Sequence, residues 1–402
     1  MRVIADLQLH SRYALATSKD MDLEHMAKGA RTKGLNLLGT GDFTHPTWFT
    51  ELREKLKPIP GTGLFSYSGM TWMLTGEVST VYEQEGKMRK VHHLIYAPDI
   101  EVVAQVNESL SKVANLSSDG RPILKGTGSA ELVELVTSIS NDVFVIPAHC
   151  WTPWFGVFGS KSGFDSLKDC YIDQVGKIFA IETGLSSDPE MNWRLSSLDR
   201  IALVSNSDAH SPNPWRLGRE ANVFELEKLS YRELFDAIRT KDTSRFLHTI
   251  EVDPAYGKYH FTGHKKCGVS LDPFDARRVG NKCPKCGRKL TIGVLQRVEE
   301  LADRVEGVRP GGTIPFKKLL PLYEVISIAT GVNRLYAKAV LEEQDRLIGA
   351  FGNEFSVLLE TSSEELFRQT KRNIAHAIIA VRENRLKFTP GYDGVYGIPV
   401  FQ

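Results

Sequence analysis

Side chains able to bind metal recur where apolar segments end, and the first case is the segment VIADLQLHSRYA at residues 3–14. It begins as an apolar strand and then places Asp6, Gln8 and His10 at alternate positions. Alternate side chains of a strand share one face. We therefore expect these three polar groups to face a site, with the two intervening leucines packed outward under helices.

Six later apolar segments carry similar groups near their ends. They supply Asp42 and His45, Glu77, His92 and His93, His149, Glu182, and Asp208 with His210. Any single group of this kind is more often structural, but their repetition favours a shared site. Imidazole and carboxylate ligands suit divalent transition metals. So many groups predict two or three divalent ions in this part of the chain, either Zn²⁺, Mn²⁺ or Mg²⁺.

Over residues 1–250, short apolar strands alternate with amphipathic helices, and the polar groups lie near the ends of the strands. One helix is expected over residues 20–33, with carboxylates in its first turn and Gly34 as its stop. Such alternation predicts an α/β fold built from βα units and closed into a barrel. Because the carboxyl ends of barrel strands meet at one rim, we expect most of the polar groups to converge there.

Residues 251–300 have a different character and contain a second ligand pattern. His264 and Cys267 form one pair, and Cys283 and Cys286 form another, with 15 residues between the pairs. This Cys₃His spacing predicts one tetrahedral, structural Zn²⁺ with no open position. The alternative is a set of free thiols in a reducing compartment.

The same segment is strongly basic. Residues 257–290 contain nine Lys or Arg and two Asp, a local charge of +7, whereas the whole chain carries only +1. The basic side chains that interleave with the zinc ligands are Lys265, Lys266, Lys285, Arg288 and Lys289. A cluster of this kind is often only a solvated face. Held on a rigid zinc module, it predicts a surface that contacts nucleic-acid phosphates.

Four tryptophans follow directly after strand-end motifs: Trp48, Trp151, Trp154 and Trp215. For each one alone, packing at the rim of the barrel is a sufficient explanation. As a set, they predict stacking platforms for a base extruded from a duplex.

Hydropathy, cysteine content and the C-terminal pattern limit the classes of protein to which the sequence can belong. No apolar run approaches the length of a membrane span, and the N-terminal segment has the pattern of a strand rather than of a signal peptide. Five cysteines, an odd number, predict a reducing, cytoplasmic setting. Residues 301–402 show helical periodicity and then an irregular tail that lacks a recognisable sliding-clamp motif, although it ends near an aromatic residue, Phe401.

The first 250 residues resemble the polymerase-and-histidinol-phosphatase (PHP) domain, a metal-dependent phosphoesterase on a distorted (β/α)₇ barrel. The resemblance is carried by residues 6–10, Glu77, His149 and the sequence SDAH at 207–210. It implies His10, Glu77, His149, Asp208 and His210 as catalytic ligands, with Gln8, Asp42 and His93 as further ligands. Two positions depart from the family pattern, because Gln8 stands where a His is usual and Phe43 follows Asp42. Gln8, His45 and His92 stay open as ligands.

The whole layout resembles the endonuclease Q family, with a PHP barrel (1–250), a basic zinc-binding module (251–300) and a helical C-terminal domain (301–402). The motifs that carry this resemblance are GTGDFTHP, the cysteine pairs and the tail PGYDGVYG. The resemblance implies a DNA repair nuclease that uses a metal-activated water to nick double- or single-stranded DNA. The nick falls 5′ to uracil, hypoxanthine, xanthine or an abasic site. Two alternatives remain, a phosphoesterase of the histidinol-phosphatase type and a catalytically inactive DNA-binding protein.

Overall fold

A mixed sheet of eleven strands is the largest element of the structure, a computed structural model that describes residues 1–332, 334 and 336–400. Its strands are β1 (Arg2–Asp6), β2 (Leu37–Gly39), β3 (Lys57–Ile59), β4 (Leu64–Tyr67), β5 (Met70–Gln84), β6 (Lys87–Ala97), β7 (Ile123–Lys125), β8 (Phe144–Pro147), β11 (Ala221–Glu225), β12 (Phe246–Glu251) and β15 (Phe316–Lys318). A separate parallel pair consists of β9 (Ala180–Glu182) and β10 (Ala202–Val204).

Seven of these strands close into a barrel. β1, β2 and β5 are parallel neighbours, and β6 joins β5 to β8 in antiparallel pairing. The Cys150 N–H donates to the Glu182 carbonyl, which links the end of β8 to β9. A parallel bridge between Leu9 and Ala209 links the end of β10 back to the end of β1. The predicted distorted (β/α)₇ barrel is confirmed, and the reversed direction of β6 is one source of the distortion.

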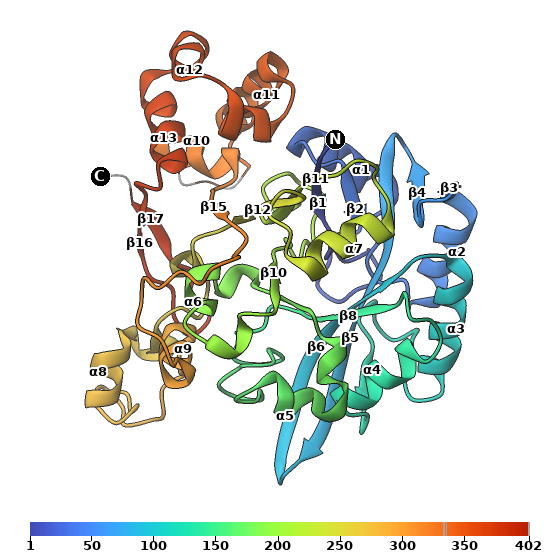
Figure 1. Cartoon of the computed structure of the whole chain (residues 1–402). Helices are drawn as coiled ribbons and strands as arrows, with labels where there is room; N and C mark the ends of the chain where they lie inside the picture. The colour runs from blue at the N-terminus through green and yellow to red at the C-terminus, as the bar shows by residue number, and fades with distance from the viewer. Residues whose placement is uncertain (333, 335, 401–402) are drawn as a thin grey trace.

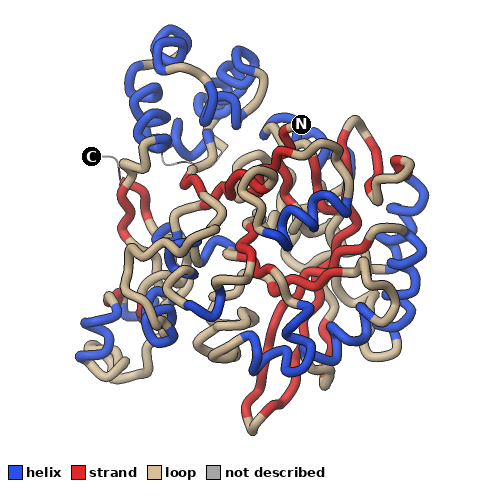
Figure 2. Tube along the Cα trace, in the orientation of Figure 1, coloured by secondary structure: helices blue, strands red, loops and turns tan. Residues whose placement is uncertain are grey.

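Helices surround the barrel (Figures 1 and 2). They are α1 (Leu23–Lys33), α2 (Pro46–Lys55), α3 (Ile100–Ser111), α4 (Ser129–Thr137), α5 (Leu167–Tyr171), α6 (Pro189–Asn192) and α7 (Tyr231–Thr240). The sequence signals for α1 act as expected, because the Asp22 side chain caps its first turn and Gly34 ends it at a φ of 100°.

The barrel interior is apolar. Side chains from all seven strands meet there in one buried cluster that includes Val3, Ala5, Leu7, Leu37, Met73, Leu94, Tyr96, Ile146, Ala180, Ala202 and Val204. Apolar residues of α7, such as Phe235, belong to the same cluster and close one end of the barrel. The opposite end, where the strands terminate in polar residues, is left for the site.

The expected polar row of the first strand is broken, because β1 ends at Asp6. The Asp6 carboxylate accepts hydrogen bonds from the backbone of Ser207 and Gly218 and has a structural role. Leu7 packs inside the barrel and not outward under the helices. Only Gln8 and His10 reach the polar rim.

The rest of the chain packs on one side of the barrel (Figure 1). Its elements are β13 (Thr262–His264), β14 (Val269–Leu271), α8 (Pro273–Arg278), α9 (Val294–Leu301), α10 (Leu322–Thr330), α11 (Lys338–Phe351), α12 (Ser363–Gln369), α13 (Arg372–Arg382), β16 (Lys387–Thr389) and β17 (Ile398–Val400). β16 and β17 pair, so the tail expected to be irregular contains a two-stranded ribbon. β15 extends the barrel sheet by pairing with β12, across the expected boundary at residue 300. Phe401, at the end of the tail, lies outside the described residues.

A buried ion pair joins the barrel to the helical region. Lys33 of α1 places its Nζ 2.6 Å from Glu354 Oε1, and the two side chains are 2% and 0% exposed. Lys33 also donates to the Pro214 carbonyl, and Glu354 accepts from the backbone N–H of Leu322 at the start of α10. Each charged group therefore has at least two partners within the protein interior.

Stability should depend on pH through Glu251, a buried residue at the end of β12. Burial raises the pKa of Glu251 to about 8, and the neighbouring carboxylates Asp188 and Glu220 oppose its ionisation further. The folded state therefore holds a proton that the unfolded state releases near pH 4.5, so stability falls as pH rises from 4.5 to 8. Glu251→Gln should flatten this dependence in urea unfolding curves, and an unchanged slope would contradict the assignment.

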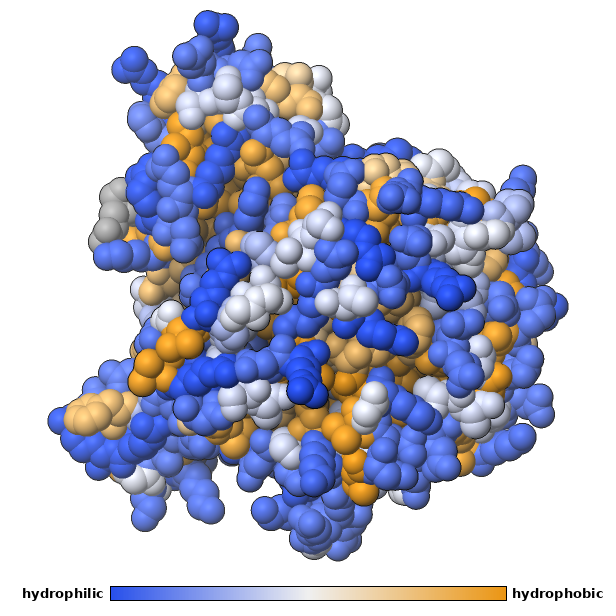
Figure 3. Space-filling model, viewed as in Figure 1, coloured by the Kyte–Doolittle hydropathy of each residue, from blue (hydrophilic) through white to orange (hydrophobic). Residues whose placement is uncertain are grey.

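The face seen in Figure 3 is mostly hydrophilic, with hydrophobic areas that are small and separate. Within the described residues, no helix combines the length and the apolarity needed to cross a membrane.

Candidate functional site

The first group of ligands lies at the ends of β1 and β10. His10 Nε2 is 3.0 Å from Glu77 Oε2 and 3.1 Å from Asp208 Oδ1. His10, Asp208 and His210 each offer a ligand atom within 4.8 Å of the others. The motif SDAH therefore meets the start of the chain, as the sequence predicts from convergence at the barrel rim.

A second group of ligands lies beside the first and contains Glu77. Glu77 Oε1 is 2.7 Å from His92 Nδ1 and 3.6 Å from His149 Nε2, while Oε2 faces His10. Glu77, His92 and His149 also offer ligand atoms within 4.8 Å of one another. Glu77 therefore belongs to the second group and also faces His10 of the first, so its carboxylate could supply a ligand atom to a divalent ion held by either group.

The chemistry of these side chains fits divalent ions. Among the described residues, Gln8 Oε1 is buried without a hydrogen-bond partner, and the buried atoms His10 Nε2 and Asp208 Oδ1 lie close to each other without forming a hydrogen bond of normal geometry. Burial lowers the pKa of His92 to about 3, which keeps its imidazole neutral and able to ligate. Burial opposes ionisation of Glu77, yet the charge of Arg121 and the surrounding imidazoles hold its pKa well below the ordinary value. Buried groups with these properties are expensive unless something compensates them.

Three residues at or next to the ligand groups have a strained backbone. Asp42, His149 and Asp208 have φ values of 48°, 29° and 47°, in the left-handed region that non-glycine residues rarely adopt. Glu182 supports His149, because its Oε2 accepts the His149 N–H while Asn206 donates to its Oε1. The fold holds these side chains in an unfavourable backbone conformation, as functional sites often do.

Asp42 lies behind His10 and not beside the other ligands. Its Oδ1 is 2.9 Å from His10 Nδ1, and its Oδ2 accepts from the N–H and O–H of Ser11. This is the position of a carboxylate that orients a ligating imidazole. Asp42 was expected to be a direct ligand, whereas the structure places it behind the ligating His10.

Replacing Asp42 by asparagine should weaken ion binding at the rim by about 10- to 100-fold, the usual effect of losing a carboxylate that orients a ligand. Asparagine tolerates the same left-handed backbone, so the substitution changes the charge and not the fold. Titration calorimetry with Mn²⁺ checks this, with the exposed Asp20→Asn as control. Wild-type affinity in Asp42→Asn would contradict the role.

Two histidines from the sequence motifs lie elsewhere. His93 is buried, and its two ring nitrogens are both engaged, Nε2 with Thr80 and Nδ1 with Tyr171, at 3.0 Å each. It has no free nitrogen for an ion, unlike the neighbouring His92. His45 precedes α2 and stacks on Tyr13 with ring centroids 4.5 Å apart, outside both ligand groups.

One residue of the centre was not expected from the sequence at all. Arg121 follows α3 in an irregular segment, and its Nη1 lies 3.5 Å from Glu77 Oε1. Gln8 lies on the other side of the same carboxylate, donating from Nε2 to Glu77 Oε2 at 3.0 Å. The segment SSDGRPIL around Arg121 contains no recognisable motif, so the tertiary structure is needed to show that Arg121 lies near Glu77.

A cavity of about 590 Å³ opens onto the ligands. Its walls include His92, His149, Asp208 and His210, together with residues 152–155, 184–186 and 257–259, Ser211, Arg216, Arg219 and Tyr396. Aromatic rings and cations dominate the part away from the ligands: Trp154 packs edge-on against Tyr259, and Lys258 lies 4.7 Å from the ring of Tyr396. The size and lining suit a single nucleotide unit.

The four tryptophans differ in how far their rings are exposed to the cavity. Trp48 and Trp151 are 0% and 1% exposed, with their indole N–H groups bonded to Gly41 and Asn192, so neither offers a ring face to a base. Trp215 is 8% exposed and packs on Tyr323 of α10, which fixes the helical region to the loop after β10. Trp154, which is 40% exposed, is the member of the set with a free face in the cavity.

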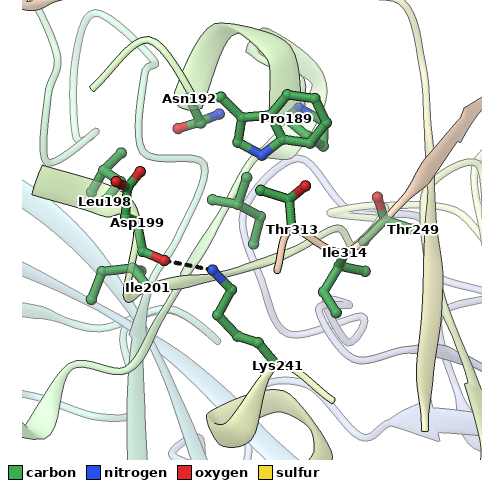
Figure 4. A pocket seen from close by; sticks show the side chains of 11 residues that line it. Pro189, Asn192, Leu198, Asp199, Ile201, Lys241, Thr249, Thr313 and Ile314 are labelled. Carbon is green, nitrogen blue, oxygen red and sulfur yellow. Dashed lines mark hydrogen bonds between the residues drawn. The ribbon is translucent and has the colours of Figure 1, made fainter. Parts of the chain in front are cut away.

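A second cavity has a volume of only about 20 Å³ (Figure 4). Lys241 crosses it and donates from Nζ to the Asp199 carbonyl at 2.6 Å. This volume holds about one water molecule. No ligand of the rim lines it, so we regard it as a packing void.

The predicted cysteine module comes together as one cluster. His264, Cys267, Cys283 and Cys286 offer ligand atoms that all lie within 4.8 Å of one another. Three thiols and one imidazole fit a tetrahedral, thiophilic ion such as Zn²⁺. The five basic residues, Lys265, Lys266, Lys285, Arg288 and Lys289, are all exposed around it.

The fold and site define a seven-stranded α/β barrel with a histidine–carboxylate centre suited to divalent ions, beside a Cys₃His module. Residues 321–385 match the family model described as the MJ0043 C-terminal domain. The MJ0043 protein of Methanocaldococcus jannaschii is 36% identical over 255 residues, which are 62% of this chain and 31% of that protein. The chain thus spans about a third of the length of that relative.

Two solved structures match the whole chain. The lesion-specific endonuclease PfuEndoQ of Pyrococcus furiosus is 37% identical, with a TM-score of 0.89 and coverage of 100% of this chain and 96% of that one. Endonuclease Q in complex with a 27-mer duplex that has an abasic lesion at the active site is 36% identical, with a TM-score of 0.89 and coverage of 100% and 97%. This chain belongs to the endonuclease Q family.

Proposed function

We propose that this protein is a DNA repair endonuclease that nicks the strand 5′ to deaminated bases and abasic sites. The observation that carries the proposal is the aromatic and basic cavity that opens directly onto the candidate ion centre. A cavity of nucleotide size beside ligands for divalent ions suits a nucleotide extruded from a duplex. The solved relative that carries an abasic duplex at its active site supports the same substrate class.

The residues have separate tasks in this proposal. Divalent ions bound at the rim supply Lewis-acid stabilisation of phosphoryl oxygens and activate water. His10, Glu77, His92, His149, Asp208 and His210 hold these ions, and Asp42 and Glu182 keep His10 and His149 in place. The cations on the cavity wall, Arg216, Arg219 and Lys258, face the phosphates that flank an extruded nucleotide.

Two physical effects would allow the enzyme to discriminate lesions from normal nucleotides. A deaminated base pairs poorly and an abasic site does not pair, so extruding either costs less than extruding a normal nucleotide. Uracil and hypoxanthine present a carbonyl oxygen where cytosine and adenine present an amino group. Donors such as the backbone N–H groups and Ser186 on the cavity wall match the carbonyl and leave an amino group unpaired.

The cysteine module completes the proposal. One Zn²⁺ held by its four ligands keeps the segment 262–290 rigid, and the five exposed cations around it contact the duplex backbone outside the cavity. These contacts position the duplex without reading its sequence.

Trp154→Ala should weaken nicking at a deoxyuridine or deoxyinosine by about 5- to 150-fold, since stacking on an aromatic ring is worth ~1–3 kcal/mol per base. Nicking at an abasic site should fall less, because that nucleotide has no base to stack. The control is Phe274→Ala, an exposed aromatic on α8 that lies outside the cavity. Equal losses on base-bearing and abasic duplexes would contradict the stacking role.

The substrate class is tested by giving one enzyme preparation two kinds of phosphate ester, with Mg²⁺ or Mn²⁺ present. Nicking of lesion duplexes without turnover of p-nitrophenyl phosphate or histidinol phosphate supports the proposal. Turnover of the small esters with intact lesion duplexes would replace it by a small-molecule phosphoesterase.

A further inference from the structure

We propose that Arg121 is a catalytic residue that contacts the non-bridging oxygens of the scissile phosphate, an inference that rests on the proposed nuclease function. Its guanidinium lies at the edge of the ion centre, with Nη1 3.5 Å from Glu77 Oε1 and 26% of the side chain exposed. The same Glu77 oxygen faces His92 and His149, which line the cavity. One carboxylate therefore separates Arg121 from the space offered to substrate.

The backbone around Arg121 is fixed by contacts on every side. The Arg121 N–H donates to Asp119 Oδ1 at 3.1 Å, and the Pro122 carbonyl accepts from Ser79 of β5 at 2.9 Å. Gly120 packs so closely on Asp42 that a Cβ there would lie 2.4 Å from Asp42 Oδ2. The chain thus brings this one cation to the centre and holds its backbone there.

The guanidinium, in contrast, keeps most of its hydrogen-bonding capacity. Its five N–H donors make one hydrogen bond among the described residues, the 3.5 Å contact with Glu77. Arg382 shows what a structural arginine does in this protein, because it donates to the carbonyls of Val357, Leu358 and Thr361. Arg121 therefore has a fixed backbone position and N–H donors that are free of partners in the described part of the chain, which makes them available to an anion.

Its charge is also permanent, because a guanidinium is not deprotonated in a protein. If Glu77 and Asp208 hold divalent ions, their carboxylate oxygens no longer neutralise the guanidinium. The guanidinium is then free to pair with another anion. Phosphodiester hydrolysis gathers negative charge on the non-bridging oxygens in the transition state, and the planar arginine fork pairs with two such oxygens at once.

The opposing interpretation is that Arg121 only neutralises Glu77. That role predicts a different phenotype, because loss of the cation would then alter ion binding and stability and not the interaction with phosphate. The two roles are separable by experiment.

The test compares Arg121→Ala and Arg121→Lys with Arg53→Ala, an exposed arginine of α2, on an abasic duplex under single-turnover conditions. We expect Arg121→Ala to lower the nicking rate by about 10²- to 10³-fold, the usual cost of losing a transition-state donor. Added guanidinium ion should restore part of the rate. Arg121→Lys should recover only part of it, because it keeps the charge and loses the fork, while Arg53→Ala keeps the full rate.

A binding measurement supplies a readout apart from catalysis. With Ca²⁺ in place of Mg²⁺, anisotropy should show that Arg121→Ala weakens binding of a tetrahydrofuran-containing duplex by about tenfold. The loss should vanish when the scissile linkage is a neutral methylphosphonate. Elemental analysis and the melting temperature should be unchanged.

Three results would overturn the inference: wild-type nicking by Arg121→Ala, no rescue by guanidinium ion, or an equal binding loss on the methylphosphonate duplex. Lower ion content in Arg121→Ala would assign the residue to neutralisation of Glu77. If the wild-type protein nicks no lesion duplex, the proposed function fails first, and this inference fails with it.

Discussion

Replacing Glu77 by glutamine is expected to lower nicking of an abasic duplex by at least about 10³-fold, because Glu77 is the carboxylate that faces both ligand groups of the rim. The glutamine side chain keeps the shape of glutamate, but its amide offers an ion a single neutral oxygen. Elemental analysis should show fewer ions per chain than in the wild type. The Cys₃His module should keep its own ion and serve as an internal reference.

Glu83→Gln is the matched control, since Glu83 is an exposed residue of the same strand β5. It should leave both the rate and the ion content at wild-type values. A Glu77→Gln protein that retains its ions and nicks within about tenfold of the wild type would remove Glu77 from the centre.

Replacing Lys33 by methionine should lower the free energy of unfolding by about 3–5 kcal/mol. The substitution leaves the Glu354 carboxylate buried, with 0% exposure, without its 2.6 Å partner. The charge then has only the Leu322 N–H and the Gln344 amide for compensation. Urea unfolding measures the loss, and the first unfolding step should release the helical region, because the pair joins α1 to the segment after α11.

The double variant Lys33→Met/Glu354→Leu should regain most of the lost stability, because it removes both charges together. Lys28→Met, on the exposed face of α1, should change the free energy of unfolding by less than about 0.5 kcal/mol. A small loss in Lys33→Met, comparable with that of Lys28→Met, would show that the buried pair does not stabilise the junction.

The parts of this architecture that the sequence predicts are those with local signals. Alternating strands and helices predict the barrel, and strand-end polar groups predict the convergence of His10, Glu77, His149 and Asp208. The pair spacing of the cysteine module predicts its cluster, because two short loops can present all four ligands. In each case residues near in sequence carry the information.

The parts that escape prediction depend on register and on distant contacts. Neighbours in a strand face opposite sides, so the sequence cannot choose between His92 and His93, whereas pairing of His92 with Ser79 in β5–β6 places His92 toward the centre. Trp215 packs on Tyr323, more than a hundred residues away, and so becomes part of a junction instead of a stacking platform. Arg121 reaches the centre through an irregular segment with no motif.

The most direct test of the proposed function maps the cut itself. Duplexes labelled at either end and carrying one deoxyuridine, one deoxyinosine, one abasic site or no lesion are incubated with the protein and with Glu77→Gln. We expect a single nick immediately 5′ to each lesion, an intact control duplex, and no product from the variant. Cuts that fall equally on the undamaged duplex, or that persist in Glu77→Gln, would contradict the proposed function.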